Sequence, residues 1–253
     1  MPSASQSAHD SSTAGAPGAL PPVLVLGMHR SGTSSLTGSL EQRGLYVGEV
    51  AASNVHNARG NRESRRITAL NQALLEHNGG SWQTPPGRLS WSASHARQRD
   101  GICAEFRAAA SGQWGFKDPR MLLTLPFWLE GLGEVRLVGT FRHPVPVARS
   151  LAQRNGLDSA AGIGLWLHYN RRLLALHSQR PFPLVCFDSA EAVYRARVDD
   201  VAAWLGLPPL PAGAPAFFES GLRNNAGAAD GIEVPAEAVS VYESLLACTD
   251  GTG

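Results

Sequence analysis

The feature that most constrains the fold is a short apolar run followed at once by a turn rich in glycine and serine. Residues 23–27 read Val-Leu-Val-Leu-Gly, which is typical of a strand buried on both faces of a sheet. The turn continues to Ser34, and residues 34–43 have the pattern of a helix that ends at Gly44. A strand, a tight turn and a helix in this order predict the first unit of a parallel α/β sheet.

The rest of the chain alternates in the same way between short apolar runs and helical patterns. Further strands are expected at residues 113–117, 135–141 and 183–187. Helices are expected at 62–77, with Asn61 as the N-cap, and at 92–110, 120–131, 145–153, 160–179 and 190–205. This alternation implies right-handed crossovers and predicts an α/β fold, with a central parallel sheet and helices on both faces.

The length of 253 residues suits one sizeable domain. Residues 1–21 are rich in Ser, Ala, Gly and Pro and lack a basic start, so we expect a disordered leader and not a signal peptide. Residues 22–253 are expected to form a single domain. Its last part, 208–253, consists of a Pro- and Ala-rich linker and a C-terminal segment with a weak helix at 235–247.

The location is expected to be cytoplasmic. The three cysteines, Cys103, Cys186 and Cys248, lie far apart and lack the paired spacing of a metal or redox site. A sparse, odd number of cysteines fits a reducing compartment. No stretch approaches the roughly 18 to 20 uninterrupted apolar residues that a transmembrane helix needs.

The charge balance argues against nucleic acid as a general partner, and the basic residues include a single lysine. The net charge is +1, whereas a general nucleic-acid binder needs a basic surplus to neutralise phosphates. Of the 22 basic residues, 21 are arginines and one is a lysine, Lys117. A codon bias towards arginine accounts for the 21 arginines, but it does not explain why the single lysine occupies position 117.

The turn after the first strand has the residues of an anion-binding loop. Gly27 and Gly32 permit a tight path, Thr33 and Ser34 add hydroxyl donors, and Arg30 adds a cation. Backbone N–H groups at the start of a helix point at the bound anion, and the positive end of the helix dipole attracts it. These features favour a phosphate-binding loop over a turn without a ligand.

The turn resembles the Gly-x-x-x-x-Gly-Lys-Ser/Thr loop of nucleotide triphosphatases, so the expected fold is of the P-loop nucleotide-binding type. Thr33 stands where that loop has its lysine, and the cation comes earlier, at Arg30. This departure is similar to the first signature of the sulfotransferase family, Gly-x-x-Arg/Lys-Ser-Gly-Thr-Ser/Thr. The resemblance covers roughly residues 22–225 and is to the bacterial carbohydrate-type and tyrosylprotein-like branch. His29 is interpreted as a turn residue and not as a catalytic base.

The resemblance implies a transferase that uses 3′-phosphoadenosine 5′-phosphosulfate and requires no metal. The loop would grip the 5′-phosphosulfate, and Arg30 would take the place of the cation that neutralises the leaving oxygen. The implied contacts come from Arg30, Ser31, Gly32, Thr33 and Ser34.

A second nucleotide contact is expected where the strand at 135–141 ends. An arginine there and a serine in the next helix can converge on one anion, because ligands of open α/β sheets bind at the carboxyl ends of the strands. Arg142 and Ser150 have this placement, and the second sulfotransferase signature, which binds the 3′-phosphate, has the same pair at the same spacing. The resemblance also suggests Arg223 as a nucleotide contact on a basic loop.

The reacting centre needs a group that stabilises the transferring sulfuryl and a base that deprotonates the acceptor. Lys117, in a Lys-Asp-Pro turn after a short strand, can donate to the sulfuryl oxygens as a compact charge. Glu63 matches the acidic base of the same relatives, and dipole compensation in the first turn of a helix explains it equally well. His56 and Asp118 remain alternative bases, although Asp118 is interpreted first as a helix cap and second as a partner that orients Lys117.

The sequence thus predicts transfer of a sulfuryl group by in-line displacement to an acceptor hydroxyl or amine. A small molecule, a saccharide or a peptide could carry that group, and the oligomeric state is not predicted. One alternative is a P-loop kinase, because Asp188 ends a strand as a magnesium-binding aspartate would. Another is a nucleotide-binding module without catalysis.

Overall fold

The computed structural model describes residues 20–50, 60–218 and 231–250. Four parallel strands form a sheet in the order β2-β1-β3-β4. They are β1 (Val23–Leu26), β2 (Gly115–Lys117), β3 (Arg136–Phe141) and β4 (Leu184–Cys186). The central pairing joins β1 to β3, with Val23 beside Arg136 and Leu26 beside Gly139. The expected α/β fold with a central parallel sheet is therefore confirmed.

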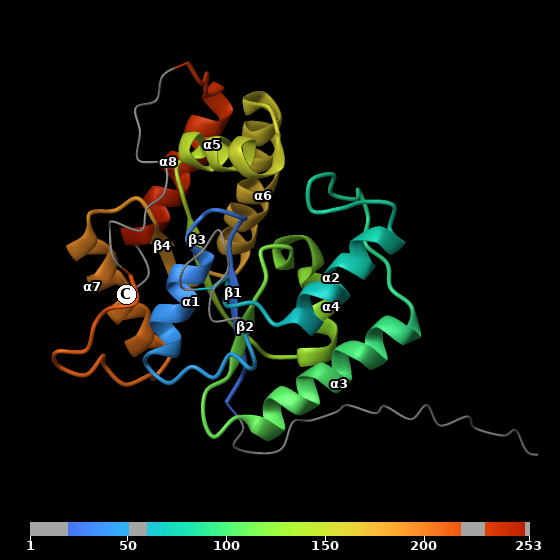
Figure 1. Ribbon diagram of the computed structural model, residues 1–253, viewed down its shortest axis with the longest axis vertical. Coiled ribbons are helices and arrows are strands. Elements are labelled where there is room, and N and C mark those ends of the chain that lie inside the picture. The colour runs from blue at the N-terminus through green and yellow to red at the C-terminus, as the bar shows by residue number, and fades with distance from the viewer. Residues whose placement is uncertain (1–19, 51–59, 219–230, 251–253) are drawn as a thin grey trace, which may run out of the picture.

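Helices fill the connections between the strands (Figure 1). They are α1 (Thr33–Glu41), α2 (Arg65–His77), α3 (Ala93–Ala109), α4 (Met121–Leu132), α5 (Pro144–Asn155), α6 (Ser159–Gln179), α7 (Glu191–Trp204) and α8 (Ala236–Asp250). Each predicted helix corresponds to one of these. The start of α2 differs from the expectation. The helix begins at Arg65 with Ser64 as its N-cap, three residues later than the expected start at residue 62 with Asn61 as the N-cap.

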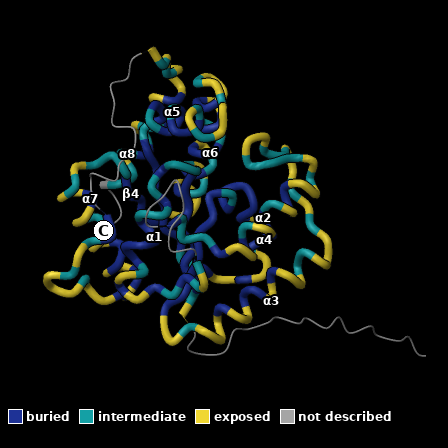
Figure 2. Tube along the Cα trace, viewed as in Figure 1, coloured by how far each residue is buried: buried dark blue, intermediate teal, exposed yellow. Residues whose placement is uncertain are grey.

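The alternation of side chains along β1 divides the core into two parts. Val23 and Val25 face a cluster that includes residues of α1 and α7, whereas Leu24 and Leu26 face a larger cluster with residues of α2, α4, α6 and α8. All four β1 side chains are fully buried, because helices cover both faces of the sheet. Figure 2 shows this arrangement, with buried strands inside and exposed residues on the outer helices.

Candidate active site

The loop between β1 and α1 follows a path that requires glycine at two positions. Gly27 lies so close to β3 that a Cβ atom there would be 2.5 Å from the carbonyl oxygen of Thr140. Gly32 has φ of +85°, and a Cβ atom there would be 2.2 Å from the ring of Phe187. Arg30, although not a glycine, has φ of +67°. Left-handed backbone at a residue with a side chain is costly and is often found at binding sites.

The loop ends at the first turn of α1, where backbone N–H groups have no acceptor within the helix. The first helical hydrogen bond goes from the Leu36 N–H to the Gly32 carbonyl oxygen, at 3.0 Å. The Ser31 hydroxyl is buried and has no hydrogen-bond partner among the described residues. The loop therefore offers several donors for an anion, as the sequence predicts.

Arg30 lies among other arginines. Its Nε donates to the hydroxyl oxygen of Ser150 on α5, at 2.7 Å. Burial, together with the positive charges of Arg154 and Arg142, lowers the pKa of Arg30 to about 10. Arg154 and Arg142 lie near enough to affect the titration of Arg30, so positive charge from α5 and from the end of β3 gathers beside the loop and favours the binding of an anion.

Arg142 follows β3 and is 4% exposed. Its Nε donates to Asp188 Oδ1 at 3.0 Å, and its guanidinium lies 5.2 Å from the ring centroid of Phe187. Asp188 Oδ2 accepts from the backbone N–H of His143 at 2.7 Å. Both oxygens of Asp188 thus have donors, and this carboxylate holds Arg142 at the end of β3. Ser150 contacts Arg30, and the expected convergence of Arg142 and Ser150 on one anion stays a prediction.

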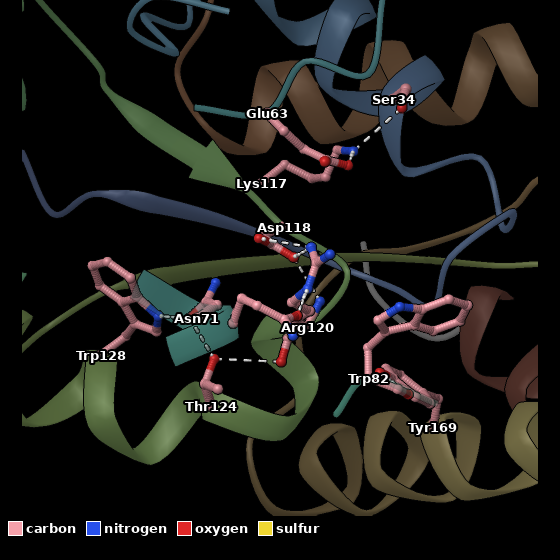
Figure 3. A network of polar contacts seen from close by, with 11 residues as sticks. Ser34, Glu63, Asn71, Trp82, Lys117, Asp118, Arg120, Thr124, Trp128 and Tyr169 are labelled. Carbon is pink, nitrogen blue, oxygen red and sulfur yellow. Dashed lines mark hydrogen bonds and ion pairs between the residues drawn. The ribbon is translucent and has the colours of Figure 1, made fainter. Parts of the chain in front are cut away.

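Lys117 lies at the end of β2 and is 1% exposed. Its Nζ lies 2.6 Å from Glu63 Oε1 and donates to the Ser34 hydroxyl oxygen at 3.3 Å. Figure 3 shows Glu63 and Lys117 facing each other below Ser34. The fold therefore joins the β1–α1 loop to Lys117 and Glu63, both of which the sequence analysis selected for the reacting centre.

Glu63 comes before Ser64, the N-cap of α2. It therefore lies just before the helix and not in its first turn, where the explanation by dipole compensation placed it. The carboxylate of Glu63 instead pairs with Lys117.

Asp118 is fully buried and contacts Arg120. Its Oδ1 accepts from the backbone N–H of Arg120 at 2.8 Å and from Arg120 Nη1 at 3.1 Å. The N-cap of α4 is Arg120, without a side-chain cap bond, so the interpretation of Asp118 as the helix cap is wrong: its carboxylate holds the turn before α4 instead. Figure 3 shows Asp118 directed towards Arg120, separate from the Lys117–Glu63 pair.

A cavity of about 340 Å³ lies over these groups. Its lining combines the loop with residues of α5 and of the segments before α2, α3 and α4: His29, Arg30, Thr33, Ser34, Asn61, Glu63, Trp82, Lys117, Pro119, Arg120, Leu151, Arg154 and Asn155. The sequence analysis missed Trp82, which lies in the expected loop 79–91. No local pattern marks such a residue, because only the tertiary fold brings it to the site.

His29 lines this cavity with its ring 4.3 Å from the ring of Trp82, centroid to centroid. The Tyr169 hydroxyl donates to the carbonyl oxygen of Trp82 at 3.0 Å, which fixes the loop that carries the indole. Burial holds the pKa of His29 well below its usual value, and the charges of Arg120, Lys117 and Arg30 lower it further. The imidazole is therefore neutral near pH 7.

Two predicted residues, Arg223 and His56, lie outside the described residues. Within the described ranges, no group of three or more His, Cys, Asp or Glu side chains could hold a metal ion. None of the helices in the described part of the chain is long and apolar enough to cross a membrane.

The comparison with known proteins gives a likeness in structure. No family model matches the sequence, and no curated protein matches it. A sulfotransferase domain from the Synechococcus olefin synthase is 16% identical, with a TM-score of 0.57 over 90% of this chain and 95% of that domain. A sulfotransferase domain from the curacin biosynthetic pathway is 15% identical, with a TM-score of 0.51 over 90% and 98%. The chain therefore has the fold of sulfotransferase domains, as the sequence motifs predict.

Proposed function

We propose that this protein is a sulfotransferase that uses 3′-phosphoadenosine 5′-phosphosulfate. The observation that carries the proposal is the contact between the anion-binding loop and the Lys117–Glu63 pair, through Ser34. A loop that binds phosphate and an acid–base pair that serves an acceptor have to meet in one cavity for group transfer. The shared fold with sulfotransferase domains supports this choice among group-transfer reactions.

The residues of the loop fit the phosphosulfate end of this nucleotide. Ser31 has a buried hydroxyl without a partner among the described residues, and the first turn of α1 offers N–H donors. Arg30 and Arg142 bring positive charge to the same region. We assign Arg30, Ser31, Gly32, Thr33 and Ser34 to the 5′-phosphosulfate. We assign Arg142 and Ser150 to the 3′-phosphate, with Arg223 as a further contact.

When bound, the nucleotide supplies a sulfuryl group attached to a phosphate leaving group. Glu63 accepts the proton of the acceptor hydroxyl or amine, which makes the acceptor atom nucleophilic. Lys117 donates hydrogen bonds to the oxygens on which negative charge accumulates. Arg30 stabilises the negative charge of the leaving group. These fixed cations supply the positive charge that phosphoryl-transfer enzymes obtain partly from magnesium.

The kinase alternative has less support. Thr33 occupies the position of the loop lysine, and Asp188, the candidate magnesium ligand, bonds to Arg142 and to the His143 N–H.

We also propose that residues 22–253 form one domain, that the protein is cytoplasmic, and that the acceptor is a small molecule, a saccharide or a peptide.

The first experiment measures nucleotide binding. Isothermal titration with 3′-phosphoadenosine 5′-phosphate should give affinities at least about tenfold weaker for Arg30→Ala and Arg142→Ala, because each loses a charge-assisted contact to phosphate. Arg88→Ala, in an exposed loop, is the matched control and should bind like the wild type. Wild-type affinity in both site variants would overturn the assignment.

The second experiment measures transfer. Labelled phosphosulfate is incubated with phenols, saccharides and tyrosyl peptides, and labelled product is separated from the nucleotide. Transfer to any of these supports the proposal. Tight nucleotide binding without transfer would instead indicate a binding module, and magnesium-dependent ATP turnover unaffected by the 3′-phosphorylated nucleotide would indicate a kinase.

A further inference from the structure

Glu63 lies on a segment without regular secondary structure, so other contacts have to hold its carboxylate in place. Residues 60–64 connect to α2, and Gly60 and Arg62 both have left-handed backbone, with φ of +74° and +55°. The conformation is unfavourable for Arg62, which has a Cβ atom, and it persists only where surrounding contacts impose it. The contacts of Arg62 therefore bear on the position of Glu63.

The side chain of Arg62 lies between two residues from other parts of the chain. Its Nε lies 3.2 Å from Glu41 Oε2, at the end of α1, in an ion pair that lacks the geometry of a hydrogen bond. Its guanidinium carbon lies 4.9 Å from the ring centroid of Phe217. The side chains of Arg62 and Glu41 are 18% and 33% exposed, so this ion pair is less screened than a pair on the surface.

Phe217 is itself attached to α1. Its backbone N–H donates to Gln42 Oε1 at 2.7 Å, and Gln42 Nε2 donates to the carbonyl oxygen of Pro215 at 3.0 Å. The ring packs against Gly38, where a Cβ atom would be 2.4 Å from it. The aromatic face that receives Arg62 is thus fixed by contacts at both its backbone and its ring.

A second anchor holds the other side of the segment. The Ser34 hydroxyl donates to the carbonyl oxygen of Asn61 at 2.9 Å. Positions 34 and 41 are seven residues apart, which places them on the same side of α1 and about 10 Å apart along its axis. The two anchors fasten residues 61–62 to one side of α1, directly before Glu63.

We propose that Arg62 is a positioning residue that holds the Glu63 carboxylate against Lys117. This inference rests on the proposed function for its catalytic consequence. Lys117 needs no such help, because it lies on β2 within the sheet. Without the contacts of Arg62 to Glu41 and Phe217, residues 60–63 lose an anchor and sample other conformations, and Glu63 moves away from the Nζ atom.

The first test follows the exposure of Lys117 and does not depend on activity. Lys117 is the single lysine of the chain, so acetylation by acetic anhydride at a lysine side chain, located by peptide mass mapping, reports on this site alone. Arg62→Gly keeps the left-handed backbone accessible and removes the side chain. The acetylation rate should rise several-fold in Arg62→Gly and in Glu63→Ala, which serves as the positive control. In Arg62→Lys, which can still pair with Glu41, the peptide map separates Lys117 from the added lysine, and the acetylation rate of Lys117 should lie between those of Arg62→Gly and the wild type.

The matched control is Arg88→Gly, the same substitution in an exposed loop, which should leave the rate unchanged. An unchanged acetylation rate in Arg62→Gly, with Glu63→Ala accelerated, would overturn the proposal whatever the enzyme does. Wild-type circular dichroism for each variant verifies that the fold is retained.

The second test is a double-mutant cycle on turnover, with labelled phosphosulfate as donor and water as the probe acceptor. Arg62→Gly should lower kcat at least tenfold and change the KM for the nucleotide less than twofold, because the contacts that it removes, to Glu41 and Phe217, lie outside the loop. In the Glu63→Gln background it should cause no further loss, because Arg62 acts through Glu63. Equal losses in both backgrounds would show a general structural role and overturn the catalytic part of the proposal.

The two tests separate this inference from the proposed function. Faster acetylation of Lys117 in Arg62→Gly together with no sulfuryl transfer by the wild type would leave the positioning role standing and overturn the proposed function. Normal transfer by Glu63→Gln would reject Glu63 as the base, and with it any effect of Arg62 on catalysis.

Discussion

Substitution of Gly32 by alanine tests whether the β1–α1 loop needs glycine at the point where the ring of Phe187 approaches it. Gly32 has φ of +85°, and the new Cβ atom would lie 2.2 Å from the Phe187 ring. Left-handed backbone costs a residue with a Cβ atom about 1–2 kcal/mol. Overpacking against a fixed side chain adds about 1–3 kcal/mol. We therefore expect Gly32→Ala to lower the free energy of unfolding by about 2–5 kcal/mol, and the displaced loop to weaken nucleotide binding at least tenfold.

Gly156 provides a matched control, because it has φ of +67° and no atom within 4 Å of the position that a Cβ would occupy. Gly156→Ala measures the backbone cost alone, which should be about 1–2 kcal/mol. Urea unfolding at 25 °C gives both values, and calorimetry with 3′-phosphoadenosine 5′-phosphate gives the affinity. In a Phe187→Ala background, the excess cost of Gly32→Ala over Gly156→Ala should disappear. An equal cost for the two glycines in the wild-type background would refute the reasoning.

Two further predictions concern single residues of the cavity. Lys117→Arg should keep the fold and the nucleotide affinity but lose most turnover. A larger planar guanidinium cannot replace the buried ammonium between Glu63 and Ser34. Transfer rates near the wild-type value would contradict this prediction. Burial lowers the pKa of His29 in the folded protein. Below about pH 6.5 the unfolded chain therefore binds more protons than the folded one. The free energy of unfolding should consequently fall as the pH is lowered from about 6.5 to 5. Urea titrations should give a smaller fall for His29→Gln, and an identical slope would reject the effect.

Much of the fold was predictable because its signals are local. The strand at residues 23–26 and the turn up to Gly32 lie next to each other in sequence, and apolar runs mark the other strands. The start of α2 was predicted three residues early, because Asn61 and Ser64 are both residue types that begin helices. In the structure Ser34 and Phe217 contact residues 61–62 in their non-helical path, and such contacts between distant residues leave no signal in the local sequence.

The site was only partly predictable. Arg30, Glu63 and Lys117 were selected from motifs, and the structure brings all three to the lining of one cavity. Trp82 was not selected, because its loop has no periodic pattern and its indole reaches His29 through tertiary contacts alone. Asp188 was considered as a magnesium ligand because it follows a strand, but its contacts are with Arg142 and the His143 N–H.

The sequence by itself determined the class of fold, the place of the glycine-rich loop after the first strand and the position of the single lysine, residue 117. These depend on neighbouring residues, whose spacing sets strand, turn and helix. Only the tertiary structure decided what that lysine contacts. Glu63 is 54 residues away in the chain and meets Lys117 because the β1–β2 pairing brings the end of β2 beside the loop. Contacts over such separations depend on packing, which no local pattern encodes.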